Sequence, residues 1–130
     1  MDRFLSIRSD ARYSRYLDAT EVIRWISALP GMSRSGLNRF SRYEGDHPLQ
    51  ILAVRCDETG NWPRGSEREP VNLIELRCDD SDEALRAGYE AVAVVIAGHF
   101  GWEVADSREG SVLWKPGQGA TAAICPTRFD

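Results

Sequence analysis

Apolar residues recur along this chain in two patterns that alternate with each other. Two windows, residues 19–29 and 81–100, have the spacing of amphipathic or buried helices. Short apolar runs before, between and after these windows predict strands. The predicted strands cover residues 3–8, 49–56, 71–78, 102–106 and 111–115. The predicted order of elements is therefore β-α-β-β-α-β-β.

Both predicted helices begin with the same signal. Asp18 precedes the first helix and Glu21 follows three residues later, which is the spacing of a capping box. The Pro-Gly pair at residues 30–31 ends this helix. Asp80 and Glu83 repeat the capping pattern at the second helix. Its second half is apolar nearly all round, so we expect it to be buried across a sheet.

The strand pattern predicts an α+β fold. The runs at 49–56 and 71–78 are apolar almost throughout, which indicates central, neighbouring strands of one hairpin. A βαββαβ core is the ferredoxin-like arrangement, an antiparallel sheet with two helices packed on one face. The alternative is an α+β sandwich in which this hairpin is central and the first strand lies elsewhere.

The segment between the first helix and the hairpin is interrupted by Ser, Gly and Pro. Leu37, Phe40 and Tyr43 are three residues apart within it. This spacing is that of a helical turn that packs onto the core.

Composition places the chain among globular proteins. It has 130 residues, of which 42% are hydrophobic and 28% charged, and we expect one domain over residues 1–130. Charged residues interrupt the first ten positions, so no signal peptide is expected. The longest apolar run, 91–97, is far shorter than the roughly 20 residues of a membrane span. Three cysteines without a close pair indicate reduced thiols and a cytoplasmic protein.

No motif in the chain names a reaction. The possible metal ligands are His47, Cys56, Cys78, His99 and Cys125, and none has the spacing of a metal site. Cys56 and Cys78 could lie near each other on adjacent strands, although free cysteines usually pack in the core. We expect no metal and no cofactor. We expect His99, at the end of an apolar helix, to be structural.

Two features leave alternative functions open. His47 follows Asp46 in a loop and could border a cleft of a small enzyme or ligand-binding domain, although a turn explains the same residues. Arginines and aromatic residues interleave at 12–16 and at 39–43, a pattern typical of single-stranded RNA contacts. A net charge of −4 disfavours a nucleic-acid partner.

The charge is unevenly divided along the chain. Residues 1–48 hold eight arginines and six acids, whereas residues 49–130 hold eight basic and fourteen acidic residues. The acids of the second part gather in two zones, one in the 57–70 connector and one at the start of the second helix. These two acidic zones consist of Asp57, Glu58, Glu67 and Glu69, and of Asp79, Asp80, Asp82 and Glu83. The connector also contains Trp62, which either plugs the core or anchors an interface.

A small acidic α+β chain with these two zones and the Trp62 loop resembles the immunity proteins of polymorphic or contact-delivered bacterial toxins. This resemblance is one of overall character and involves no motif. It implies a non-enzymatic inhibitor that covers the active site of a cognate toxin or another basic protein. Acidic residues would then speed association and orient the complex. We predict the residues of the two acidic zones and Trp62 to bind the partner.

Overall fold

A computed structural model of the chain describes residues 2–36, 38–44, 47–57, 59, 70–79, 83–106 and 110–116. The elements within these residues are seven strands and two helices. They are β1 (Asp2–Arg8), α1 (Ala19–Ser27), β2 (Ser33–Arg34), β3 (Arg39–Glu44), β4 (His47–Val54), β5 (Leu73–Asp79), α2 (Glu83–Phe100), β6 (Glu103–Asp106) and β7 (Val112–Trp114).

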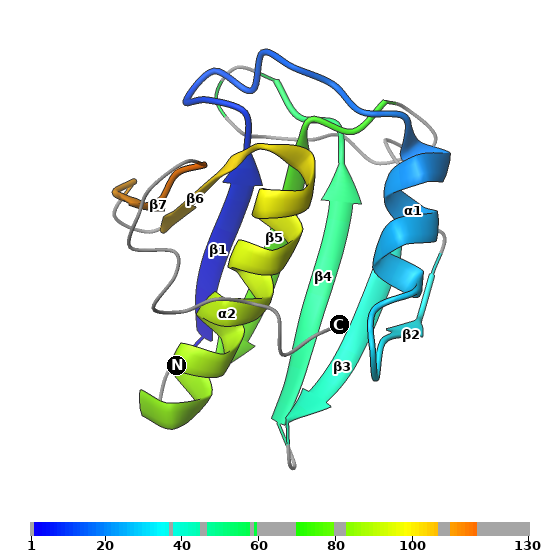
Figure 1. Cartoon of the computed structure of the whole chain (residues 1–130), viewed down its shortest axis with the longest axis vertical. Coiled ribbons are helices and arrows are strands. Elements are labelled where there is room, and N and C mark those ends of the chain that lie inside the picture. Colours follow the sequence, from blue (N-terminus) through cyan, green and yellow to red (C-terminus); the bar gives the residue numbers. More distant parts are fainter. Residues whose placement is uncertain are drawn as a thin grey trace.

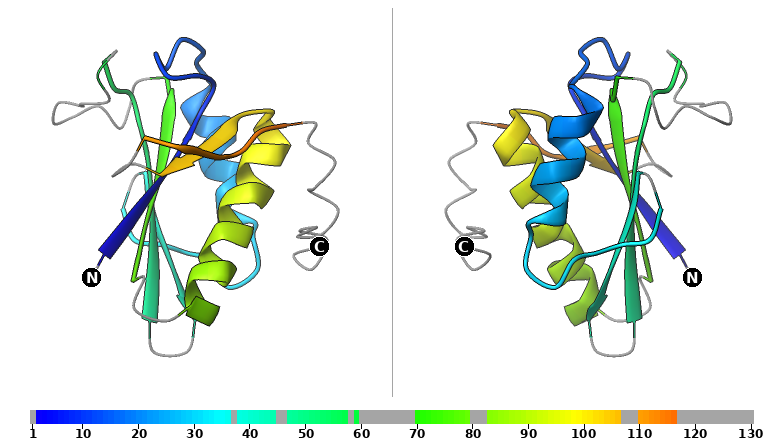
Figure 2. Two further views of the ribbon diagram at one scale, coloured as in Figure 1. Left: turned by 90° about the vertical axis from the view of Figure 1, so that its left-hand side faces the viewer. Right: turned by 90° about the vertical axis from the view of Figure 1, so that its right-hand side faces the viewer.

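The strands of the described residues form one seven-stranded antiparallel sheet in the order β2-β3-β4-β5-β1-β6-β7. Both helices lie on the same face of this sheet (Figures 1 and 2). The predicted α+β class is confirmed, as is the packing of two helices on one face. Strand β1 lies between β5 and β6, so the alternative that placed the first strand elsewhere is wrong.

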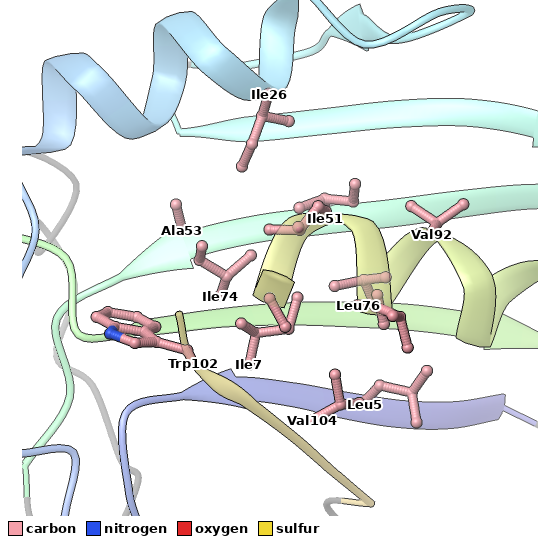
Figure 3. Packing of buried hydrophobic residues seen from close by; sticks show 14 of the residues in the cluster. Leu5, Ile7, Ile26, Ile51, Ala53, Ile74, Leu76, Val92, Trp102 and Val104 are labelled. Atoms are coloured by element: carbon pink, nitrogen blue, oxygen red, sulfur yellow. The ribbon is translucent and has the colours of Figure 1, made fainter. Parts of the chain in front are cut away.

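Between the helices and the sheet lies one apolar core. Helix α2 packs across β1, β5 and β6, while α1 packs over β4. Figure 3 shows side chains of the strands meeting those of the helices in this layer. The fully or almost fully buried residues that it labels are Leu5, Ile7, Ile26, Ile51, Ala53, Ile74, Leu76, Val92, Trp102 and Val104. No helix among the described residues has the length and apolar character that crossing a bilayer requires.

The two helices meet through aromatic rings near their C-terminal ends. The rings of Trp25 and His99 stack 4.1 Å apart at an interplanar angle of 11°. Phe100 packs edge-on against both rings. The exposed His99 therefore makes a packing contact between α1 and α2.

The segment before the β4–β5 hairpin differs from its prediction. Residues 39–44 form strand β3, which pairs with β4 in a register that puts Phe40 opposite Ile51. The helical turn predicted from Leu37, Phe40 and Tyr43 is therefore wrong. Polar residues flank Phe40 on both sides, so the same sequence also fits the alternation of a strand, and a neighbouring strand was available to complete its hydrogen bonds.

Helix α1 begins as its sequence predicts. The Asp18 carboxylate accepts hydrogen bonds from the backbone N–H groups of Thr20 and Glu21, at 2.8 and 3.2 Å. The predicted cap of α2, Asp80, lies outside the described residues.

We expect Asp18→Ala to lower the free energy of unfolding by about 1 kcal/mol, because two N–H groups of the first turn lose their acceptor. Urea denaturation followed by circular dichroism measures this change. Asp18→Asn is the matched control, since asparagine caps helices equally well and should retain most of the stability. An equal loss in both variants would contradict the capping role.

Candidate functional site

The pleat of the central strands divides their side chains between two faces. Leu76 of β5 belongs to the core beneath the helices, and Leu5 pairs with it from β1. Because alternate residues of a strand point to opposite faces, Glu75, Arg77 and Phe4 point away from the helices. We call this second surface the helix-free face. Among the described residues, no helix covers it (Figure 2).

One end of the helix-free face is closed by the connector between β1 and α1. The buried amide of Asn72 donates hydrogen bonds to the carbonyl oxygens of Tyr13 and Cys56, at 3.1 and 3.0 Å, and accepts one from the Cys56 N–H at 2.7 Å. Tyr13 packs against a small buried cluster of Val54, Cys56 and Leu73. These contacts bury the end of β4 and leave the middle of the face accessible.

A groove lies in the middle of this face. Its volume is about 270 Å³. Residues of β1, β3, β4 and β5, with Ser35 from the β2–β3 connection, surround it. The lining residues are Phe4, Ser35, Arg39, Phe40, Gln50, Ile51, Leu52, Glu75 and Arg77. The groove thus combines apolar walls with one carboxylate, one side-chain amide and two arginines.

The arginine nearest the aromatic wall is Arg77. Its guanidinium carbon lies 5.8 Å from the centre of the Phe4 ring, within the range of a cation–π interaction. Arg39 and Gln50 are exposed, while Phe4, Leu52 and Glu75 are half-buried. The apolar walls therefore lie deeper than the two charged arginine heads.

Glu75 is the unusual residue of the groove. Among the described residues, no hydrogen bond or ion pair reaches its carboxylate. Burial raises its pKa, and no neighbouring cation offsets this effect. A second glutamate of the same face behaves differently: the carboxylate of Glu103 accepts a hydrogen bond from Nε of Arg8 at 2.9 Å. Within the part of the chain that the structure describes, Glu75 is therefore a partly desolvated carboxylate without a counter-charge.

The predicted acidic zones lie at opposite ends of the β4–β5 hairpin. Asp57 follows β4 and is exposed, whereas Asp79 is the last residue of β5. The register pairs Val54 with Leu73, so about 20 Å of strand separates the two ends. Glu83 begins α2. The remaining predicted residues, Glu58, Trp62, Glu67, Glu69, Asp80 and Asp82, lie outside the described residues.

The two described cysteines do not form a shared site. Cys56 follows β4 at one end of the hairpin, whereas Cys78 lies near the other end of β5. They also belong to different buried clusters. The expectation that they could lie near each other is wrong, because the antiparallel register places the two Arg-Cys-Asp sequences at opposite ends. Burial, with a smaller contribution from Asp57, raises the pKa of the Cys56 thiol to about 11, so it is a poor nucleophile.

The described residues contain no group of three or more His, Cys, Asp or Glu that could hold a metal ion. His47 is the first residue of β4 and pairs with Glu44 across the β3–β4 connection. Residues 45–46, between β3 and β4, lie outside the described residues, so the turn interpretation of this sequence stays a prediction.

The aromatic residues of the 12–16 sequence lie against arginines outside this sequence. The guanidinium carbon of Arg8 lies 5.7 Å from the centre of the Tyr13 ring. The guanidinium carbon of Arg55 lies 5.8 Å from the centre of the Tyr16 ring. Along β3 the pleat sends Arg39 to the helix-free face and Phe40 into the core. The 39–43 sequence is therefore divided between two faces of the sheet.

Sequence reasoning missed Glu75 and the groove around it. The signal was present, because Glu75 is a charged residue inside the otherwise apolar run VNLIEL. A lone charge at this position indicates a strand with one face that is not fully covered. Neither models of known protein families nor curated proteins match this chain.

The raised pKa of Glu75 predicts how the stability of the protein depends on pH. For an acid whose pKa is higher in the folded than in the unfolded state, stability falls as the pH rises between the two values. The loss of stability begins near pH 4.3, about the pKa of glutamate in the unfolded chain, and is complete when the pH is above the pKa of Glu75 in the folded chain. We expect Glu75→Gln to raise the urea midpoint at pH 7, with a gain that shrinks toward pH 4.

Glu103→Gln is the control on the same face. It removes the charge that pairs with Arg8, so the urea midpoint at pH 7 should not rise. A Glu75→Gln protein less stable than wild type at pH 7 would show that the carboxylate has a stabilising partner.

Proposed function

We propose that this protein is a non-enzymatic inhibitor of the immunity type, which neutralises a basic partner protein by covering its active site. The carrying observation is the groove on the helix-free face, whose half-buried carboxylate lacks a counter-charge within the described chain. A surface of this kind suits a protein that supplies the missing cation. We place the protein in the cytoplasm, where free cysteines stay reduced.

The size of the groove favours protein contact over the binding of a substrate. Pockets that enclose small-molecule ligands commonly measure about 300–1,000 Å³. The groove, at about 270 Å³, is at the lower limit of this range and lies on a broad sheet face. It has room for one side chain of a partner, while the surrounding strands supply additional contact area.

Charge supports the same proposal. The chain carries a net charge of −4, and the exposed Asp57 lies at one end of the hairpin whose other end carries Asp79. Toxin domains that act on nucleic acids or nucleotides are commonly basic, because they bind phosphates. An acidic inhibitor would therefore associate quickly with such a partner at low salt.

The direct experiment uses the product of the neighbouring open reading frame. If this product arrests growth when expressed alone, co-expression of the present chain should restore growth, and the two proteins should purify as a complex of fixed stoichiometry. Growth arrest that persists despite soluble expression of both proteins would overturn the proposed function.

The two acidic zones can be compared in the same complex by double charge reversals of equal size. One variant carries Asp57→Lys with Glu58→Lys, and the other Asp80→Lys with Asp82→Lys. We expect at least one of them to slow association at least about tenfold at low salt and to weaken its salt dependence. Stopped-flow measurements between about 50 and 300 mM salt test this. Wild-type association in both variants would contradict the electrostatic contribution.

A further inference from the structure

The groove of the helix-free face contains a charge that the described chain leaves without a counter-charge. Glu75 lies on β5, the fourth of seven strands, so it is far from both sheet edges. It is half-buried beside the side chains of Phe4 and Leu52. Desolvation of a carboxylate is costly unless a cation or hydrogen-bond donor replaces the lost water. The position therefore favours an incoming cation.

We propose that the groove is a receptor for a single arginine side chain of the partner protein, with its guanidinium on the carboxylate of Glu75. This inference rests on the proposed function, since the occupant belongs to the partner. It names the chemistry of the contact: a planar, weakly hydrated cation paired with a partly desolvated carboxylate.

The lining of the groove fits the whole arginine side chain. Phe4 and Leu52 offer an apolar wall for its methylene groups. The exposed Gln50 adds an amide oxygen, which can accept a further N–H bond. Guanidinium is the better match than ammonium, because its five donors can reach the carboxylate and the amide together.

The two arginines of the groove do not satisfy Glu75 themselves. No nearby cation lowers its pKa. Arg77 lies over the Phe4 ring, and Arg39 comes from β3, on the far side of β4 from Glu75. Because both arginines are cations, an anion is the alternative ligand of the groove. The experiment must therefore distinguish the binding of an anion from the binding of a guanidinium.

The experiment titrates the isolated wild-type chain with N-acetyl-arginine amide and follows backbone amides by two-dimensional NMR. N-acetyl-citrulline amide is the neutral isostere, and N-acetyl-aspartate amide is the anionic probe. We expect the arginine probe alone to shift amides of β1, β4 and β5 around the groove, with a dissociation constant on the order of 1–10 mM.

Glu75→Gln should weaken this binding at least about tenfold, because a charge-assisted contact becomes a neutral one. The variant is expected to fold, since it removes a charge without a partner among the described residues. Glu103→Gln, on the same face, should bind the probe as wild type does. Equal binding of citrulline, binding of the aspartate probe instead, or retained affinity in Glu75→Gln would each overturn the assignment.

Failure of this inference and failure of the proposed function give different results. If the neighbouring gene product is neutralised and Glu75→Gln forms the complex with wild-type affinity, the arginine contact is wrong and the inhibitor function stands. If the arginine probe binds at the groove and no toxin is neutralised, the site stands and the inhibitor function is wrong.

Discussion

Strand β5 places Ile74, Leu76 and Cys78 against the helices, and the same pleat forces Glu75 and Arg77 onto the opposite face. This strict alternation is the constraint on which the rest of the structure depends. A shift by one residue in the pairing of β5 would move the carboxylate of Glu75 into the core and expose Leu76. The core therefore fixes the register, and the register places Glu75 in the groove.

The sequence contained enough information for the class and order of most elements. Asp18 and Glu21 predicted the start of α1, because capping is a local interaction between neighbouring residues. The two central strands were predicted from their apolar runs, which are also a local property of the sequence. Strand β3 was missed because the positions of Phe40 and Tyr43 fit a helical period as well, and only the neighbouring β4 decides between the two.

Features of the site depended on register, which local patterns do not encode. Cys56 and Cys78 follow identical residues in similar strands, yet the antiparallel pairing separates them by most of the hairpin. The same pairing puts Asp57 and Asp79 at opposite ends of the hairpin, a conclusion that needs only the direction of the two strands. The groove required more: side chains of β1, β3, β4 and β5 had to be brought into one surface.

The contrast between Glu75 and Glu103 supports a role in binding. Glu103 lies in β6 and pairs with Arg8 across the β1–β6 ladder. Glu75 occupies the more central strand, where a leucine or valine would pack against Phe4 and Leu52 without losing hydration. A carboxylate at this position lowers the stability of the free chain above its pKa. A partner that brings a guanidinium offsets this loss of stability, because its charge compensates the desolvated carboxylate. The carboxylate is already desolvated in the free protein, so the groove binds a cation in preference to a neutral side chain.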